Sequence, residues 1–486
     1  MKLKKYWQWL VIALVTITLT TFGRNFALAQ PISHYSDLEY PPLAEIELPK
    51  YDRISLDNGM VVYLMEDHQL PLVTGNAILK TGDRLEPEQL VGVAELTGNL
   101  IRTGGTAKHS KNQLDTILEQ KAASVETSIG STSGSASFNS LSYDLDEVFA
   151  LFAEVLRYPI FENSFLDLEK NRVRGAIARR NDNARDIVNR EFRKLIYGEN
   201  NPYARTIEYE TLEKITRDDV VEFYQQHIRP ENIILGIVGD FEPEKIKALI
   251  KENFGDWQVN NSPISPDIPH AQQKITNALY LVDQPQLTQS NILLGHLGGK
   301  LNDPNYPTLT VINGILNGFG GRLHNEVRSR QGLAYSVYGV WRANYDYPGT
   351  FFAGGQTKTE SSGDFIKAIK TEIEKLRTEM VSEEDLNYAK DSILNSFVFQ
   401  FQSKPQILSR IMTYEYYDYP QDFIFNYQKA VTNTTAKEVF EVAKQYLQPE
   451  KIVTLVVGNG EQVKENLQQL NQPIKTVDIT IPVAQS

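Results

Sequence analysis

The histidines of this chain, the residues that most often hold a catalytic metal, lie too far apart to form a metal site on one helix. There are seven of them, and no two are three to five residues apart: His34, His68, His109, His227, His270, His296 and His324. His324 and Glu326 are closer, but residues i and i+2 point to different faces of a helix. There is no cysteine, which excludes thiolate ligands and disulfides together. The sequence therefore predicts no metal site built on a helical histidine pair.

The first 29 residues have the composition of an export signal. A lysine-rich start at residues 2–5 precedes an apolar run at residues 7–22, and Ala27-Leu28-Ala29 follows. This order predicts cleavage after Ala29 and export to the periplasm or the extracellular space. The apolar run is short for a membrane span, and no other stretch approaches about 20 apolar residues. We therefore expect no span after cleavage; an uncleaved anchor is the alternative.

The composition describes a large folded protein. A chain of 486 residues is too long for one hydrophobic core, so two or more domains are expected. Apolar residues make up 41% and charged residues 23%, as in ordinary globular proteins. The formal net charge is −12, and cleavage of the signal, with four basic and no acidic residues, takes it to −16. This charge argues against nucleic acid as a partner.

An internal repeat predicts two homologous halves. Residues 216–239 align without a gap with residues 435–458, at an offset of 219. Both copies begin with Thr and an acid three residues later, a helix-capping pattern, and continue through Pro-Glu into a β-rich run that ends at Gly. Residues 76–87 and 291–304 repeat with a similar offset of 217 between their closing prolines. Two copies of a long α+β unit are expected, and not a solenoid of short repeats.

Local patterns place several elements. Asn58-Gly59 between two apolar runs predicts a strand pair over residues 54–67. An apolar helical period predicts a helix from Pro87 to a stop at Gly104-Gly105. The Ser-rich segment 128–140 is interpreted as a strand. A helical turn or two from Arg322 to about Arg330, ended by Gly332, should precede a strand.

Together these patterns divide the chain into six parts. They are a signal (1–29), a lead (30–50), a first half (51–257), a proline-rich linker (258–275), a second half (276–482) and a tail (483–486).

Four stretches resemble the pitrilysin/insulinase metallopeptidases, which include the mitochondrial processing peptidase. They are LDNGMVVYLMED, VGVAELTGNLIRTGGT, the paired PENIILGIVG units and GGRLHNEVRSRQGLAYSVYG. The resemblance covers essentially the whole mature chain and implies an α+β fold of two homologous α/β-sandwich halves that closes as a clam-shell with a partner chain. Active members carry H-x-x-E-H on the first long helix, where two His hold zinc and the Glu is the general base.

The resemblance implies that this zinc site has been lost. The motif is replaced by Glu95-Leu96-Thr97-Gly98-Asn99. Glu95 and Asn99 match the two His ligands, and Gly98 matches the base. The family's third ligand, a Glu on a later helix, is matched by Ala176 or by Gly175. The surrounding context survives as Gly92, Ala94, Gly105 and Thr106. We expect no cofactor in this chain, although Glu95 alone leaves a weak metal open.

The second half keeps a pair that the family uses. Arg328 and Tyr335 match the Arg and Tyr that reach the zinc site from the second half and contact the substrate carbonyl. A guanidinium and a phenol are suitable donors to the oxyanion of peptide hydrolysis. The alternative is a solvated helix-end cation and an ordinary strand aromatic. Gly320 and Gly321 either let a substrate backbone approach or only form a turn.

The resemblance implies three functions. The first is a non-zinc subunit whose Arg328 and Tyr335 complete the site of a partner with intact H-x-x-E-H and zinc. The substrate would be an extended peptide, which could pair with a sheet edge of each chain. The second is an inactive peptide-binding or scaffolding protein of the cell envelope. The third is an active peptidase with an unfamiliar metal site.

Overall fold

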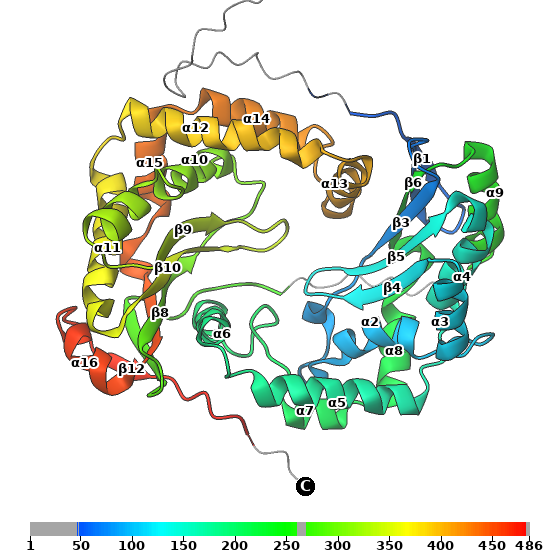
Figure 1. The fold of residues 1–486 in the computed structure, drawn as a ribbon, viewed down its shortest axis with the longest axis horizontal. Coiled ribbons are helices and arrows are strands. Elements are labelled where there is room, and N and C mark those ends of the chain that lie inside the picture. Colours follow the sequence, from blue (N-terminus) through cyan, green and yellow to red (C-terminus); the bar gives the residue numbers. More distant parts are fainter. Residues whose placement is uncertain (1–45, 47, 260–268, 483–486) are drawn as a thin grey trace, which may run out of the picture. The chain divides into compact units, whose positions relative to one another are not determined.

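The computed structural model describes residue 46 and residues 48–259 and 269–482, which form two six-stranded sheets with helices packed on them (Figure 1). The predicted signal, almost all of the lead, the middle of the linker and the tail lie outside the described residues, and the predicted domain bounds stay a prediction. Among the described residues, no helix combines the length and the apolar character that a bilayer crossing requires.

The first sheet is mostly antiparallel and has the order β1-β2-β6-β3-β5-β4. Its strands are β1 (Asp52–Ser55), β2 (Val61–Glu66), β3 (Leu72–Leu79), β4 (Ser124–Ile129), β5 (Gly134–Leu141) and β6 (Ile233–Gly239). Only β2 and β6 run parallel. Strand β6 is buried at every position, as expected for a central strand that is covered on both faces.

The second sheet repeats this plan in the order β12-β7-β11-β8-β10-β9. Its strands are β7 (Ala278–Asp283), β8 (Gln289–Leu297), β9 (Ser336–Arg342), β10 (Thr350–Lys358), β11 (Val453–Gly458) and β12 (Ile474–Thr476). Five strands correspond in order and direction to five of the first sheet, including the parallel pair β7 and β11. The prediction of two homologous α+β halves is confirmed.

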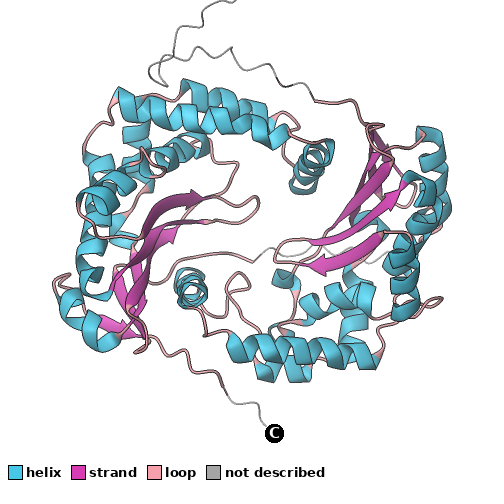
Figure 2. Ribbon diagram, viewed as in Figure 1, coloured by secondary structure: helices cyan, strands magenta, loops and turns pink. Residues whose placement is uncertain are grey.

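Each sheet carries its main layer of helices on one face (Figure 2). The helices encoded before the linker are α2 (Val93–Thr103), α3 (Lys111–Gln120), α4 (Leu145–Arg157), α5 (Asn163–Arg179), α6 (Ala184–Tyr197), α7 (Tyr209–Lys214), α8 (Arg217–His227) and α9 (Pro243–Phe254). Those after it are α10 (Tyr306–Leu316), a π-helix (His324–Arg330), α11 (Ser362–Thr378), α12 (Glu383–Phe397), α13 (Lys404–Tyr417), α14 (Phe423–Asn433), α15 (Ala436–Tyr446) and α16 (Gly460–Gln468).

The repeated helix starts are built as predicted. The Thr216 hydroxyl accepts from the backbone of Asp219 at the start of α8, and the Asp219 carboxylate accepts from the Thr216 amide. Thr435 and Glu438 make the same reciprocal pair at the start of α15. Because each box satisfies two amides that have no partner inside the helix, the sequence fixes both helix starts locally.

Three local predictions need correction or refinement. The predicted pairing of β1 with β2 is confirmed, but the turn spans five residues between Ser55 and Val61, with Gly59 at φ 86°. The helix expected from Pro87 begins only at Val93, because Gly92 has a φ angle of 110°, which lies outside the range of an α-helix. The Ser-rich segment forms parts of two strands, β4 and β5, because a tight turn divides it.

One helix from each half of the sequence packs on the other half's sheet. Helix α6 lies on the second sheet, where Ile187 and Phe192 join a core with residues of β8 and β11. Helix α13 lies on the first sheet, where Ile411 and Met412 pack against Tyr63 and Ile234. Each sheet is therefore covered on its second face by a helix from the opposite half.

Candidate functional site

Helix α2 carries the positions that match the lost zinc motif, and a buried carboxylate fixes its start. Glu86 Oε2 accepts hydrogen bonds from the backbone amides of Gly92 and Ala94, each at 3.1 Å. Burial raises the pKa of Glu86 to about 8, against the opposing effect of these two bonds. The helix start is therefore held by a side chain six residues upstream and not by a residue at its own cap.

An ion-pair network joins the two α2 positions that were matched to the family's His ligands with two residues of α5. Its members are Glu95 and Asn99 on α2 and Glu169 and Arg172 on α5, and we call it the Arg172 network. The Arg172 guanidinium donates to Glu169 at 2.8 Å and to Glu95 at 2.7 Å, and the Asn99 amide donates to Glu169 at 3.2 Å. The two carboxylates raise the pKa of Arg172, with Glu169 the larger cause.

This network does not fit a zinc ion. Arg172 is paired with both Glu95 and Glu169, and its positive charge at this point repels a divalent metal. Asn99 has no imidazole, and its amide nitrogen points to Glu169 as a donor. In the part of the chain that the structure describes, no group of three or more His, Cys, Asp or Glu is placed to hold a metal.

The position of the general base is closed by the backbone of a neighbouring strand. A Cβ atom at Gly98 would lie 2.3 Å from the amide nitrogen of Ile129 and 2.8 Å from the carbonyl carbon of Ser128, both in β4. The Thr127 hydroxyl also donates to the Gly98 carbonyl oxygen at 2.7 Å. Helix α2 and strand β4 thus touch at a point where only glycine fits, which excludes a glutamate in the same backbone position.

Ala176 and Gly175, the two candidates for the third ligand, lie near the end of α5. Ala176 is exposed and shares a helix face with Glu169 and Arg172, which lie seven and four residues before it. Neither Glu169 nor Arg172 was predicted from the sequence to lie at this place. The i−4 and i−7 spacing from Ala176 is the signal that could have identified them.

Arg328 and Tyr335 flank the turn that leads from the π-helix into the edge strand β9. Arg328 is exposed, and the Tyr335 side chain is 73% exposed. Within the described residues neither side chain has a hydrogen bond or ion pair. The Arg328 carbonyl oxygen accepts from Gly332 at 3.1 Å, and the Tyr335 amide donates to Gln356 at 3.0 Å. Backbone hydrogen bonds therefore fix the main chain at Arg328 and Tyr335, while the guanidinium and the phenol hydroxyl have no partner within the described residues. The role of these two side chains in a site stays a prediction.

Gly320 and Gly321 have packing reasons of their own. A Cβ at Gly321 would lie 2.0 Å from the carbonyl oxygen of Asn317, and one at Gly320 would meet the ring of Tyr388 at 2.7 Å. The Gly320 amide donates to the Tyr388 hydroxyl at 3.1 Å. The turn alone explains both glycines, and contact with a substrate stays a prediction.

Two asparagine side chains occupy part of the outer edge of β9, and peptide pairing with a sheet edge stays a prediction. The Asn317 side chain bonds both the amide and the carbonyl of Gly339, at 3.0 and 2.6 Å. The Asn313 side chain does the same for Trp341, at 2.6 and 3.0 Å. Because both groups of one residue point to the same side of a strand, these are the groups turned away from β10. No peptide can pair at Gly339 and Trp341 unless both asparagines move.

Two family models match this chain. Residues 61–210 match the model described as insulinase, peptidase family M16, and residues 214–393 match the one described as the peptidase M16 inactive domain. The boundary between the two matches falls within α7, so strand β6 of the first sheet belongs to the second match.

Individual relatives differ in what they are called. The chain is 22% identical to the uncharacterized zinc protease YmxG of Bacillus subtilis, over 74% of this chain and 86% of that protein. It is 20% identical to the non-peptidase homolog YmxG of Helicobacter pylori, over 82% of this chain and 92% of that protein. The names of these relatives therefore do not show whether this chain is an active or an inactive peptidase.

Solved structures share the fold. A peptidase M16 inactive domain from Pseudomonas fluorescens superimposes with a TM-score of 0.74 and 23% identity, over 84% of this chain and 98% of that chain. The periplasmic protease PqqL of Escherichia coli gives a TM-score of 0.70 and 17% identity, over 86% of this chain and 47% of that chain. With both halves matched by models of one family, this chain belongs to peptidase family M16.

Proposed function

We propose that this chain is the non-zinc subunit of a two-chain metallopeptidase of the cell envelope. In this proposal the partner is a family member with intact H-x-x-E-H that holds the zinc, and the substrate is an extended peptide. The chain contributes Arg328 and Tyr335 to the partner's site. The single observation that carries the proposal is the contrast between a closed site on α2 and two available donors beside β9.

The closed site argues against catalysis by the chain alone. Hydrolysis by this family needs metal ligands and a base, and the matching positions hold an ion-paired Glu95, a Gly98 in contact with β4, and Asn99. A glutamate at position 98 would also require α2 to move away from β4. The contact between Gly98 and β4, and not only the residue types, therefore argues against a general base at position 98.

The available donors support a role in stabilising charge. A guanidinium and a phenol that bond an oxygen only as it becomes negative lower the barrier more than they strengthen ground-state binding. Both groups are exposed and have no acceptor within the described residues, so a bound substrate can take their hydrogen bonds. An isolated strand aromatic would gain more from burial than from 73% exposure.

Export is part of the proposal. The N-terminal segment has the order of a cleaved signal, and one structural neighbour, PqqL, is described as periplasmic. The absence of cysteine is compatible with an oxidising compartment because no free thiol is exposed to it.

The test uses the chain assembled with a zinc-bearing family member from the same cell. Arg328→Ala and Tyr335→Phe should each lower kcat by about 10²- to 10³-fold, the usual effect of losing one oxyanion donor, while KM changes little. Assembly, measured by size-exclusion chromatography, should be unchanged. Arg330→Ala is the matched control, because Arg330 is two residues away and is paired with Glu326 at 2.9 Å.

A peptide-binding or scaffolding protein without catalytic partner is the second candidate. It is favoured by the Helicobacter pylori relative that is called a non-peptidase homolog. Full activity of both the Arg328 and the Tyr335 variants in the assembled pair would remove the reason for the first proposal and leave this one.

A further inference from the structure

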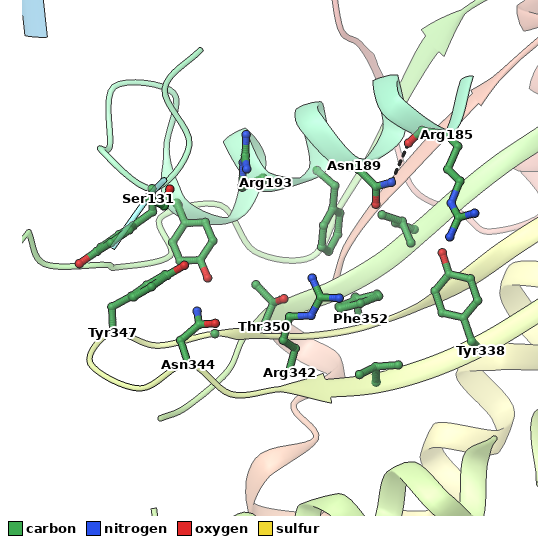
Figure 3. A pocket seen from close by; sticks show the side chains of 16 residues that line it. Ser131, Arg185, Asn189, Arg193, Tyr338, Arg342, Asn344, Tyr347, Thr350 and Phe352 are labelled. Atoms are coloured by element: carbon green, nitrogen blue, oxygen red, sulfur yellow. Dashed lines mark hydrogen bonds between the residues drawn. The ribbon is translucent and has the colours of Figure 1, made fainter. Parts of the chain in front are cut away.

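A polar pocket lies between α6 and the second sheet, on the face opposite the main helix layer. Its volume is about 540 Å³. Figure 3 shows α6 along one side and the strands β9 and β10 along the other, with Arg342 projecting toward the helix and Arg185 close to the Tyr338 hydroxyl. The size is that of a site for a small ligand or for a few side chains of a larger one.

The charge of the pocket is opposite to that of the chain. Three arginines line it, Arg185 and Arg193 from α6 and Arg342 from β9, and no Asp or Glu does. The whole chain has 61 acidic and 49 basic residues, so an acid-free lining with three arginines departs from its overall balance. None of the three guanidinium groups makes an ion pair within the described residues.

Two nearby acids do not cancel this charge. The Asp346 carboxylate forms a largely buried ion pair with Arg84, with 2.7 Å between Oδ2 and Nη1. Asp83 accepts from the Ser131 hydroxyl at 3.0 Å, and burial raises the pKa of Asp83 above its ordinary value. Arg193 acts on Asp83 only through space. Three positive charges therefore share a space without a matched acid.

Tyrosines provide neutral donors beside the arginines. Tyr338 and Tyr347 line the pocket, and neither hydroxyl makes a hydrogen bond within the described residues. Burial raises the pKa of Tyr347 to about 12, and burial also raises the pKa of Tyr338, where Arg185 and Arg342 oppose the effect. Both phenols are protonated at neutral pH. Arg185, Arg342 and Tyr338 line the same pocket, so both guanidinium groups and the phenol face one space.

An apolar floor strengthens these interactions. Phe192 of α6, Leu293 of β8 and Phe352 of β10 line the same space. The Arg342 guanidinium lies 5.5 Å from the centre of the Phe352 ring. Charges above an apolar surface are less screened by water than charges on an open surface. A ligand that brings negative charge here would therefore gain more than at an ordinary surface arginine.

We propose that this pocket binds the carboxylate side chains of an acidic segment of a peptide. Guanidinium groups pair with carboxylates through two parallel hydrogen bonds, and phenols donate a further bond. A peptide is the favoured carrier because Tyr338, Val340 and Arg342 alternate along one face of β9, at the spacing of side chains in an extended chain. Since Gly339 and Trp341 have their outer backbone groups bonded to asparagines, recognition here is by side chains.

This inference names a substrate class for the proposed peptide site, and it rests on that function only for the choice of a peptide as carrier. The test measures binding to the full mature chain alone, without a zinc-bearing partner. The probe is a fluorescent peptide of alternating Glu and Ser with both ends blocked. The matched peptides carry Gln or Lys in place of every Glu, and a fourth carries Gln with a free C-terminal carboxylate.

The Glu peptide should bind at least tenfold more tightly than the Gln peptide, and the Lys peptide should not bind. Arg185→Gln and Arg342→Gln should each weaken the Glu peptide roughly three- to tenfold, and the double variant more, because each exposed guanidinium contributes one charge-assisted contact. Arg179→Gln, which removes an exposed arginine of α5 outside the pocket, is the control and should leave binding unchanged. Arg342→Lys should restore part of the affinity, since it keeps the charge without the planar fork.

Equal affinity for the Glu and Gln peptides overturns the proposal, and so does full binding by the Arg185 and Arg342 double variant with an unchanged circular dichroism spectrum. Equal binding of the Glu peptide and the free-carboxylate Gln peptide also overturns it, in favour of a site for chain termini. The result is separable from the proposed function: acidic-peptide binding by the isolated chain stands even if the Arg328 and Tyr335 variants are fully active in the pair.

Discussion

Replacing Gly98 with alanine should destabilise the chain, although the same change in most helices is favourable. The added Cβ would lie 2.3 Å from the amide nitrogen of Ile129 and 2.8 Å from the carbonyl carbon of Ser128. Ordinary carbon contacts are about 3.5–4.0 Å. Backbone atoms cannot rotate away as a side chain can, so α2 or β4 must shift as a unit.

The magnitude follows from two opposing effects. Alanine in place of glycine inside a helix gains about 1 kcal/mol. Forcing a methyl group into a filled space costs about 1–3 kcal/mol, and a contact with backbone belongs at the upper end. The net expectation for Gly98→Ala is a loss of about 1–2 kcal/mol in the free energy of unfolding.

A second helical glycine provides the control. Gly175 lies on α5, and the nearest atom to an added Cβ is the Arg179 Nη2 at 3.7 Å. Gly175→Ala should therefore gain up to about 1 kcal/mol. Urea unfolding followed by far-ultraviolet circular dichroism should move the two midpoints in opposite directions, with similar slopes. If Gly98→Ala stabilises the protein as much as Gly175→Ala does, α2 and β4 do not touch at this point, and the argument that a general base cannot fit there is wrong.

Three further predictions test separate parts of the structure. Burial raises the pKa of Glu86 from 4.5 to about 8, so between these pH values the folded chain keeps a proton that the unfolded chain releases. The free energy of unfolding should therefore fall as pH rises through this window. Urea unfolding at several pH values should show this fall, and Glu86→Gln should make it smaller. Arg172→Ala should change stability by less than about 1 kcal/mol, because its ion pairs with Glu95 and Glu169 are largely solvent-exposed on the Arg172 side; a loss of several kcal/mol would show that the network holds α2 to α5. The protein recovered from the cell envelope should begin at Gln30 by N-terminal sequencing, whereas an intact Met1 on cytosolic protein would contradict export.

The features that the sequence predicted are those fixed by local or repeated patterns. Thr216 and Thr435 mark the same capped helix start in both halves, and the strand after each helix enters the centre of each sheet. A repeat of this length constrains topology because equivalent strands must find equivalent neighbours. The repeat therefore predicts that the two sheets share one strand order, which holds for all strands except β1 and β12.

Other features depend on contacts that no local pattern encodes. The exchange of α6 and α13 between the sheets is a matter of tertiary packing, since an amphipathic helix does not state which sheet its apolar face covers. Asn313 of α10 and Asn317 at the C-cap of that helix lie one turn apart, but only the structure shows that both bond the outer edge of β9. The occupied edge could therefore not have been predicted.

The sequence predicts which positions of the candidate site have changed, but not which residues contact them. Loss of the ligand residues is predicted from the sequence once the motif context is matched to Glu95, Gly98 and Asn99, and this match stays a prediction. What replaces the metal is not visible, because Arg172 belongs to another helix and contacts these positions only through the packing of α5 on α2. The reason that Gly98 is a glycine is likewise set by β4.

The most direct test of the central claim is the zinc content of the purified mature chain after dialysis against zinc, measured by inductively coupled plasma mass spectrometry. A chain whose former site is closed by Arg172 and Gly98 should retain far less than one zinc per molecule. One tightly held zinc per chain, removed by a chelator together with peptide hydrolysis by the chain alone, would contradict the account.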